Sequence, residues 1–162
     1  MTDAAITRLA RRLGRALSKR RVAIATAESC TGGGVAEAIT RISGSSDWFD
    51  RGFVTYSNAA KRDMLGVARA TLGRHGAVSA QTAREMARGA LRRSRAQASV
   101  AITGIAGPTG GSRAKPVGLV FIAWARRGRA PDAERFDFKG GRASIRRQSV
   151  AAALQGLLER LR

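Results

Sequence analysis

The sequence predicts an α/β fold, a three-layer α/β/α sandwich built around a mixed, mostly parallel sheet. Compact apolar runs of strand character alternate along most of the chain with segments whose apolar residues recur at helical spacing. Near the C-terminus two strand-like runs follow each other across a turn, which adds an antiparallel hairpin to the sheet. A chain of 162 residues can bury one core, and we expect residues 1–162 to form a single domain.

The first part of the chain alternates helix and strand from its beginning. Its elements are predicted, in order, as a helix with the stripe Ile6, Leu9, Leu13, Ala16 and Leu17, a strand at 22–27, a helix over 33–42, a strand at 52–57, and a short helix over 58–65 capped by Asn58. The next segment holds the single histidine, His75, between two glycines. We interpret that segment as an exposed turn.

The second part repeats the alternation and then ends in a hairpin and a helix. Its elements are predicted as a helix capped by Ser79 that ends near Ser94, a strand at 99–104, a glycine-rich loop at 105–116, a long strand at 117–125, a turn at 126–132, an edge strand at 134–139 and a closing helix over 143–161. The edge strand is expected to pair with the long strand before it.

Three of the predicted loops carry the unusual side chains of this chain. They are Glu28–Gly33 after the first strand, Tyr56–Lys61 after the second and Thr103–Gly111 after the third. Ligands of open α/β sheets bind outside the carboxyl ends of the parallel strands. We therefore expect these three segments to meet in one site.

The composition bounds the class of protein. Hydrophobic residues make up 44% of the chain, which argues against disorder, and no uncharged apolar run reaches the roughly 18 residues of a membrane helix. The arginine-rich first helix has features of a mitochondrial transit peptide, but Asp3 comes early and the helix runs directly into the first strand. We interpret it as a structural helix and expect a cytoplasmic protein without a membrane partner.

A single cysteine and a single histidine limit the metal chemistry of the chain. One cysteine forms no internal disulfide and no cysteine-based zinc site. One histidine adds too little for a transition-metal site built by the protein alone. We therefore expect neither a metal nor a cofactor.

The formal net charge of +19 permits two interpretations. In the first interpretation the arginines coat solvent faces, since they are spread over many predicted elements; in the second they bind nucleic acid. No zinc-finger, RNA-binding or helix-turn-helix pattern supports the second interpretation. Aromatic residues at 5% are also too few for a base-stacking platform. We expect no specific nucleic-acid partner.

Ser29, in the segment TAESCTGGG at 26–34, raises the question of catalysis. It lies in a strand-to-helix turn, where serine often caps a helix, but the same position exposes a nucleophile to backbone N–H groups. A nucleophilic serine needs a base. Lys61 is one candidate, because a helix N-terminus and partial burial both lower the pKa of a lysine, and a solvated surface lysine is the alternative interpretation. His75 is the other candidate base, although its segment reads as an exposed turn.

Two further features could serve a site at these strand ends. Cys30 is a rival nucleophile, because a thiol near a helix N-terminus has a lowered pKa. Adjacent residues in a turn usually point apart, so Ser29 and Cys30 are not expected to share one pocket. The segment TGIAGPTGG at 103–111 could hold a phosphate with its backbone amides, but it matches neither the Walker pattern nor the dinucleotide-binding pattern.

Five segments taken together resemble the CinA C-terminal domain family. They are AESCTGG at 27–33, GFVTYSNAAK at 52–61, GAVS at 76–79, ITGIAGP with GG at 102–111, and KPVG at 115–118. The resemblance runs over essentially the whole chain in matching order and spacing. It implies a three-layer α/β/α domain, in agreement with the pattern of elements.

The resemblance also implies an activity, because stand-alone members of this family are bacterial nicotinamide-nucleotide amidases. The implied reaction is hydrolysis of the carboxamide of nicotinamide mononucleotide to nicotinate mononucleotide and ammonia, in pyridine nucleotide salvage. Ser29 is implied as the nucleophile and Lys61 as the base, with Tyr56 beside it. From their positions at the strand ends we further expect the oxyanion or the substrate to be bound by Glu28, Cys30, Thr31, Gly32, Gly33, Thr103, Gly104 and Gly107, with Thr103 offering its hydroxyl. Arg142 is expected to open the final helix, to fold back toward the glycine-rich loop and to bind the phosphate of the substrate.

The implied partner is a small nucleotide substrate, and a homo-oligomer stays open. Many family members carry an additional N-terminal domain similar to molybdopterin-binding proteins. This chain begins with its own short helix, so we expect activities on ADP-ribose or pyrophosphate bonds to be absent. The alternatives are a catalytically idle nucleotide-binding protein and a basic nucleic-acid-binding module.

Overall fold

Five strands form one mixed sheet at the centre of the molecule. The computed structural model describes residues 1–161. The sheet order is β2 (Phe49–Val54), β1 (Ile24–Glu28), β3 (Ala98–Gly104), β4 (Leu119–Arg126) and β5 (Asp132–Asp137). Strands β2, β1 and β3 run parallel, whereas β4 and β5 are antiparallel to their neighbours. The predicted mixed sheet with its hairpin is therefore confirmed.

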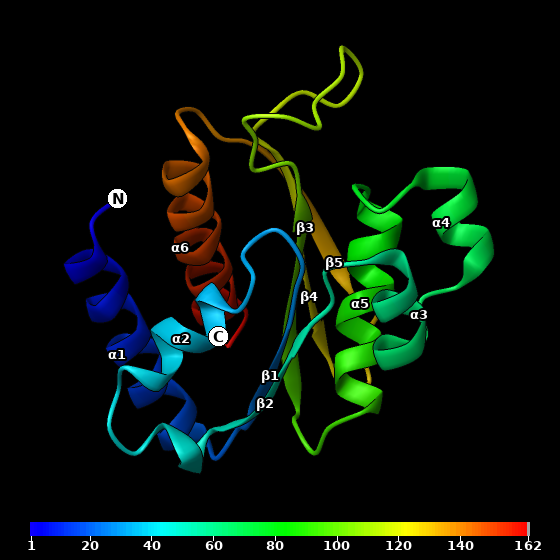
Figure 1. Cartoon of the computed structure of the whole chain (residues 1–162). Helices are drawn as coiled ribbons and strands as arrows, with labels where there is room; N and C mark the ends of the chain where they lie inside the picture. The colour runs from blue at the N-terminus through cyan, green and yellow to red at the C-terminus, as the bar shows by residue number, and fades with distance from the viewer. Residues whose placement is uncertain (162) are drawn as a thin grey trace.

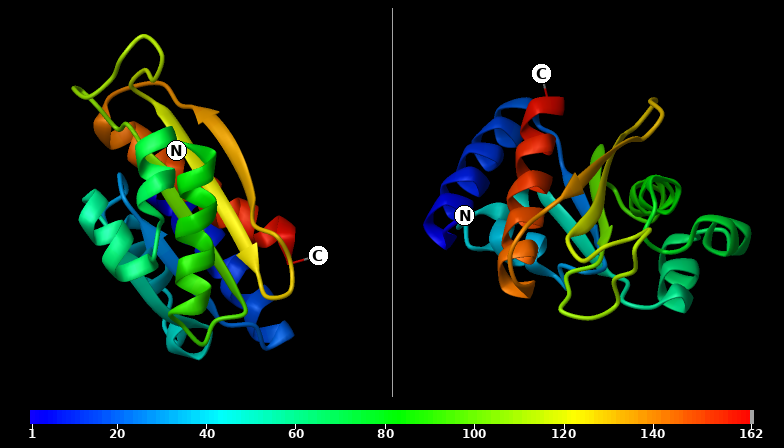
Figure 2. Two further views of the ribbon diagram at one scale, coloured as in Figure 1. Left: turned by 90° about the vertical axis from the view of Figure 1, so that its right-hand side faces the viewer. Right: turned by 90° about the horizontal axis from the view of Figure 1, so that it is seen from above.

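Helices cover both faces of this sheet, which confirms the predicted three layers. One face carries α1 (Asp3–Arg20), α2 (Gly34–Thr40) and α6 (Arg142–Arg160), and the other carries α3 (Asn58–Leu65), α4 (Arg69–His75) and α5 (Ala80–Arg92). The view from above shows the sheet edge-on between the two helical layers (Figure 2). A short 3-10 helix, η1 (Ser45–Asp47), leads into β2. Within residues 1–161 no helix is long and apolar enough to cross a bilayer.

The two faces of the sheet differ in the size of their side chains. The face toward α1, α2 and α6 is filled mainly by large aliphatic residues, which include Leu13, Leu17, Ile24, Ile39, Val100, Ile102, Ile122 and Leu154. The face toward α5 is rich in alanine, with Ala25, Ala27, Ala83, Ala87, Ala90, Ala101 and Ala123. Small residues let helices approach closely: a methyl group at Gly89 of α5 would collide with the Leu65 carbonyl of α3. Helix α3, which carries Lys61, is thereby held against α5.

The boundaries of some elements differ from the prediction. Strand β2 ends at Val54, not at residue 57, and Ser57 instead caps α3 by accepting a hydrogen bond from the Ala60 amide. Asn58, predicted as the cap, is the first residue inside that helix. The segment interpreted as a turn contains α4, which ends at His75. Helix α4 buries no residue and has no side-chain cap, so its sequence carries little periodic signal.

The three parallel strands end at the same edge of the sheet. In Figure 1 this is the upper edge, where the glycine-rich loop between β3 and β4 projects beyond the helical layers. Strand β1 is the central one of the three, and all five of its residues are buried. Because β1 is flanked by β2 and β3, the segments that follow all three strands are brought together.

Candidate active site

The central feature of this edge is a direct contact between Lys61 and Ser29. The Lys61 Nζ lies 3.0 Å from the Ser29 Oγ and 2.9 Å from the carbonyl oxygen of Thr55. Ser29 directly follows β1, and Lys61 lies in the first turn of α3, which follows β2. Both residues were expected at this edge because they follow neighbouring parallel strands, and the structure brings them within hydrogen-bond distance.

Lys61 is buried, which is unusual for a lysine without a carboxylate partner. Only 2% of its surface is exposed, and the two contacts of its Nζ are both to neutral oxygens. Burial penalises the ammonium form, and this desolvation lowers the pKa of Lys61 below that of a free lysine. The interpretation as a solvated surface lysine is thereby excluded. A lysine that loses its proton more easily is suited to act as a base.

The Ser29 side chain does not cap α2, because Glu28 does so. The Glu28 carboxylate accepts hydrogen bonds from the amides of Val35 and Ala36 at the start of that helix, at 3.0 and 2.9 Å. It also accepts a hydrogen bond of 2.6 Å from the Thr31 hydroxyl. Glu28 is 1% exposed, so its carboxylate binds the turn and the start of α2 from the protein interior and does not reach toward a ligand. The Ser29 hydroxyl is left for Lys61.

The turn after Ser29 also presents backbone N–H groups. Gly32 and Gly33 have φ angles of +56° and +93°, a conformation that favours glycine, and the Gly32 amide donates to the Ser29 carbonyl at 2.9 Å. Within residues 1–161 the amides of Cys30 and Thr31 donate to no oxygen atom of the protein. Two unpaired donors therefore lie directly after the serine.

Cys30 does not have the properties expected from its position near a helix. Its side chain is 6% exposed and belongs to the hydrophobic core on the α6 side of the sheet. Burial raises the pKa of its thiol to about 11, and this desolvation outweighs the lowering effect of its own backbone amide. The expectation of a lowered pKa is wrong. Cys30 is also directed away from the Ser29–Lys61 contact into the core, as adjacent turn residues usually are.

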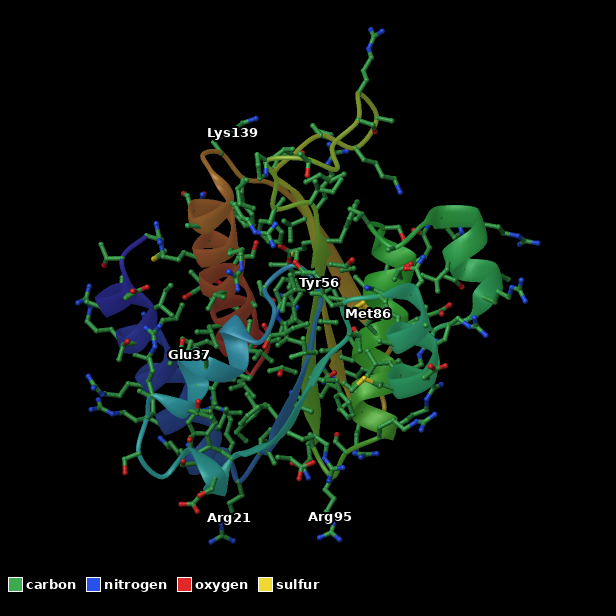
Figure 3. The ribbon with its side chains drawn as sticks, in the orientation of Figure 1. Arg21, Glu37, Tyr56, Met86, Arg95 and Lys139 are labelled. Carbon is green, nitrogen blue, oxygen red and sulfur yellow. The ribbon has the colours of Figure 1, made fainter. Side chains whose placement is uncertain are left out.

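Tyr56 and Arg142 form a second cluster at the same edge. The Arg142 guanidinium donates to the Tyr56 hydroxyl at 2.8 Å and to the Gly107 carbonyl at 2.9 Å. Arg142 is the first residue of α6 and folds back toward the glycine-rich loop, as the sequence predicted. Tyr56 is 60% exposed, and Figure 3 shows it near the upper ends of β1 and β2. Exposed aromatic and cationic groups thus lie beside the buried pair.

Thr103 and Gly104 are used by the fold itself. The Thr103 hydroxyl donates to the Ala77 carbonyl at 2.7 Å and is 1% exposed, so its hydrogen is not free for a ligand. A methyl group at Gly104 would press on Val120 and on the Leu119 carbonyl of β4. The expectation that Thr103 offers a hydroxyl donor to the substrate therefore needs correction. These two residues shape the start of the loop that carries Gly107.

Two basic residues of this region were missed from the sequence. Arg146 donates from Nη2 to the Thr31 carbonyl at 2.8 Å, and Lys115 donates from Nζ to the carbonyls of His75 and Val78 at 2.7 and 2.8 Å. Arg146 follows Arg142 by four residues on α6, so helical spacing could have placed both on one face. Lys115 lies in an irregular loop, and no local pattern indicates its contacts.

Most other basic side chains lie away from this site. His75 is exposed at the end of α4 and makes no side-chain contact with Ser29 among the residues described. Arg21 and Arg95 project from the opposite end of the molecule (Figure 3). Arg127, in the predicted turn at 126–132, donates to the carbonyl of Leu91 in α5 and to those of Ser94 and Ala96 after it. Within residues 1–161 no group of three or more His, Cys, Asp or Glu residues could hold a metal ion.

Comparison with known proteins places these features in a family context. The model described as the CinA C-terminal domain matches residues 6–161. A protein of Pseudomonas putida named nicotinamide-nucleotide amidohydrolase PncC is 54% identical over 154 residues, which cover 95% of this chain and 96% of that protein. A protein of the same name from Escherichia coli strain K12 is 53% identical over 157 residues, covering 97% of this chain and 95% of that protein.

A solved structure has nearly the same fold as this chain. The crystal structure of the competence/damage inducible protein CihA from Agrobacterium tumefaciens superposes with a TM-score of 0.94 at 52% identity. The match covers 96% of this chain and 94% of that one. The arrangement of strands and helices around Ser29 and Lys61 is therefore similar to that of a solved protein over nearly its full length.

Proposed function

The chain belongs to the CinA C-terminal domain family, and on this premise we propose that it hydrolyses the carboxamide of nicotinamide mononucleotide to nicotinate mononucleotide and ammonia. The observation that carries the proposal is the buried contact of 3.0 Å between Lys61 Nζ and Ser29 Oγ. An amide is a poor electrophile, so its hydrolysis needs an activated nucleophile, a proton donor for the leaving nitrogen and stabilisation of the oxyanion. The residues at this edge can supply all three.

The first half of the proposed reaction forms an acyl-enzyme. Neutral Lys61 accepts the proton of the Ser29 hydroxyl while the Ser29 oxygen attacks the carboxamide carbon. The Thr55 carbonyl holds one N–H of the lysine at 2.9 Å, which leaves the lone pair free to face Ser29. The carbonyl oxygen of the substrate becomes an oxyanion, for which the amides of Cys30 and Thr31 are the available donors. Protonated Lys61 then gives its proton to the leaving nitrogen, and ammonia departs.

The second half of the proposed reaction releases the product. Water takes the place of ammonia, and Lys61, neutral again, removes a proton from it. The resulting nucleophile attacks the ester carbon, and the oxyanion forms again in the same place. When the ester bond breaks, Lys61 returns the proton to the Ser29 oxygen. One base serves both halves, as microscopic reversibility requires.

The cationic group for the phosphate of the substrate is proposed to be Arg142. Its guanidinium lies at the rim of the site between Tyr56 and Gly107, and its side chain is exposed. One guanidinium group can donate two parallel hydrogen bonds to two oxygens of a phosphate, which also orients the ligand. Tyr56 lies on the same side and offers an exposed ring to the nucleotide. Substrate binding in this proposal depends on one arginine and not on the total charge.

Ammonia release by the purified protein tests the proposal directly. The protein is incubated with nicotinamide mononucleotide, and with nicotinamide and asparagine as competing amides, and ammonia is measured by a coupled assay. We expect release from the mononucleotide, and loss of at least ~10³-fold in Ser29→Ala, the scale found when a catalytic unit is broken. Cys30→Ala is the matched control at the adjacent position and should keep most of the activity. Ammonia from none of the three amides would refute the proposal.

A further inference from the structure

Arg146 contacts the serine-bearing turn but has no role in the reaction steps above. It lies in the second turn of α6, and its Nη2 donates to the Thr31 carbonyl at 2.8 Å. The same Nη2 lies 3.5 Å from the position that a Cβ on Gly32 would occupy. The guanidinium therefore packs directly against the backbone of the turn, and any side chain at Gly32 would meet it.

The contact of Arg146 has a specific effect on one peptide unit. The carbonyl of the peptide between Thr31 and Gly32 accepts from Arg146, and the N–H of that same peptide donates to the Ser29 carbonyl at 2.9 Å. Both polar ends of this peptide are thus held, one from α6 and one from the serine itself. A third contact comes from the protein interior, where the Glu28 carboxylate accepts a hydrogen bond of 2.6 Å from the Thr31 hydroxyl. These three contacts hold the backbone that directly follows the amides of Cys30 and Thr31.

The side chain is kept in this place at a cost. The Nε of Arg146 is buried and has no hydrogen-bond partner within the described part of the chain. A buried donor without an acceptor costs about 1–3 kcal/mol, so simple stability does not account for this arginine. The next residue, Arg147, is exposed, and its side chain makes no hydrogen bond among residues 1–161. Arg146 and Arg147 carry the same charge, so what distinguishes Arg146 is its contact with the turn after Ser29.

We propose that Arg146 is the positioning residue of the oxyanion site: it fixes the Thr31–Gly32 peptide so that the amides of Cys30 and Thr31 face the developing oxyanion. The inference rests on the proposed function in so far as that function needs an oxyanion site after Ser29. The positive charge also acts on the turn, since Arg146 lowers the pKa of the neighbouring Cys30 thiol, although burial outweighs this effect. Preorganised donors and nearby positive charge both stabilise an oxyanion.

A comparison of two adjacent arginines tests the inference. Arg146→Ala should lower kcat for the mononucleotide by ~10- to 100-fold, because outright loss of one oxyanion donor costs ~10²–10³. KM should stay close to the wild-type value, since Arg146 is not assigned to the phosphate. Arg147→Ala, which removes the same charge one residue later, should keep both kcat and KM. A kcat that is unchanged in a folded Arg146→Ala protein, or a loss that appears only in KM, would overturn the inference.

A serine-directed fluorophosphonate gives a second readout that does not depend on the natural substrate. The reagent forms a tetrahedral adduct with an activated serine and also needs oxyanion donors, and mass spectrometry locates it on Ser29. Arg146→Ala should react more slowly than wild type by a factor similar to the loss in kcat, and Arg147→Ala should react normally. If wild type is labelled but releases no ammonia from the mononucleotide, the proposed substrate is wrong while the inference is still judged by labelling. Wild-type protein that is not labelled at Ser29 would overturn both.

Rescue experiments separate positioning from simple packing. Free guanidinium ion at non-denaturing concentration should restore part of the labelling rate of Arg146→Ala, and it should not accelerate Arg147→Ala. Arg146→Lys, which keeps a cationic donor, should react at a rate between those of Arg146→Ala and wild type, and it serves as the folded variant if the alanine protein unfolds. If neither guanidinium nor the lysine variant recovers any rate, Arg146 only packs and the inference is wrong.

Discussion

Replacement of Lys61 by methionine or arginine is the most direct perturbation of the site. Methionine keeps most of the length of the buried stem and removes the amine. Arginine keeps a cation, but its guanidinium does not lose a proton near neutral pH. Both variants lose the base that lies 3.0 Å from Ser29 Oγ. We expect kcat/KM to fall by at least ~10³-fold in both, which corresponds to about 4 kcal/mol of transition-state stabilisation.

The pH dependence of wild type gives the sign of the effect. Only neutral Lys61 can accept the proton of Ser29, so kcat/KM should rise tenfold per pH unit below the pKa of Lys61 and level off above it. Burial lowers this pKa, so the rise should level off below the ~10.4 of a free lysine. The measurement is initial-rate ammonia release across pH at fixed ionic strength. The Lys61→Arg protein should show only residual activity without this rise.

The pH dependence of the free energy of unfolding reports on the pKa of Lys61 without any substrate. Between the lowered pKa of folded Lys61 and the ~10.4 of the unfolded chain, the unfolded state binds more protons, so the free energy of unfolding rises with pH. Below the folded pKa the buried ammonium carries its full desolvation cost. Urea unfolding at several pH values should show this rise in wild type and not in Lys61→Met. An equal pH slope in both proteins, together with a Lys61→Arg enzyme of near wild-type rate, would refute the assignment of Lys61 as a buried base.

Three further predictions concern the neighbours of this pair. Iodoacetamide at pH 8 should modify Cys30 at least ~100-fold more slowly in folded than in urea-unfolded protein, because its thiol pKa is raised from 9.0 to about 11. Arg142→Ala should raise KM for the mononucleotide by ~10- to 100-fold, on the order of the 1.5–3 kcal/mol of one charge-assisted contact, whereas Arg88→Ala, on an exposed face of α5, should not change KM. Glu28→Ala should lower the free energy of unfolding by at least about 3 kcal/mol in urea titration, because it leaves two helix amides and the Thr31 hydroxyl without their acceptor.

The sequence determined the order of the elements and the location of the site. Strands and helices bury their residues with periods of 2 and 3.6, and this signal is local, so it is legible without knowledge of the partners. The convergence of the loops after β1, β2 and β3 followed from the general rule for parallel strands. Ser29 and Lys61 lie in two of these loops and were therefore expected to meet, whereas Arg142 was expected to fold back toward the third loop from the start of the final helix. Helix α4 was not predicted, because it buries no residue and its sequence therefore has no apolar stripe.

Only the tertiary structure decided what each side chain at the site does. Glu28, Ser29, Cys30 and Thr31 are adjacent in sequence, yet they lie respectively under a helix terminus, against a lysine, in the hydrophobic core and against Glu28. The pKa of Cys30 is raised and that of Lys61 is lowered because of the residues that pack around them, and these come from distant parts of the chain. Burial and electrostatic environment are sums over neighbours in space. A local sequence pattern gives the type of a side chain. Its pKa and its unpaired hydrogen-bond donors and acceptors are set by contacts that only the folded chain makes.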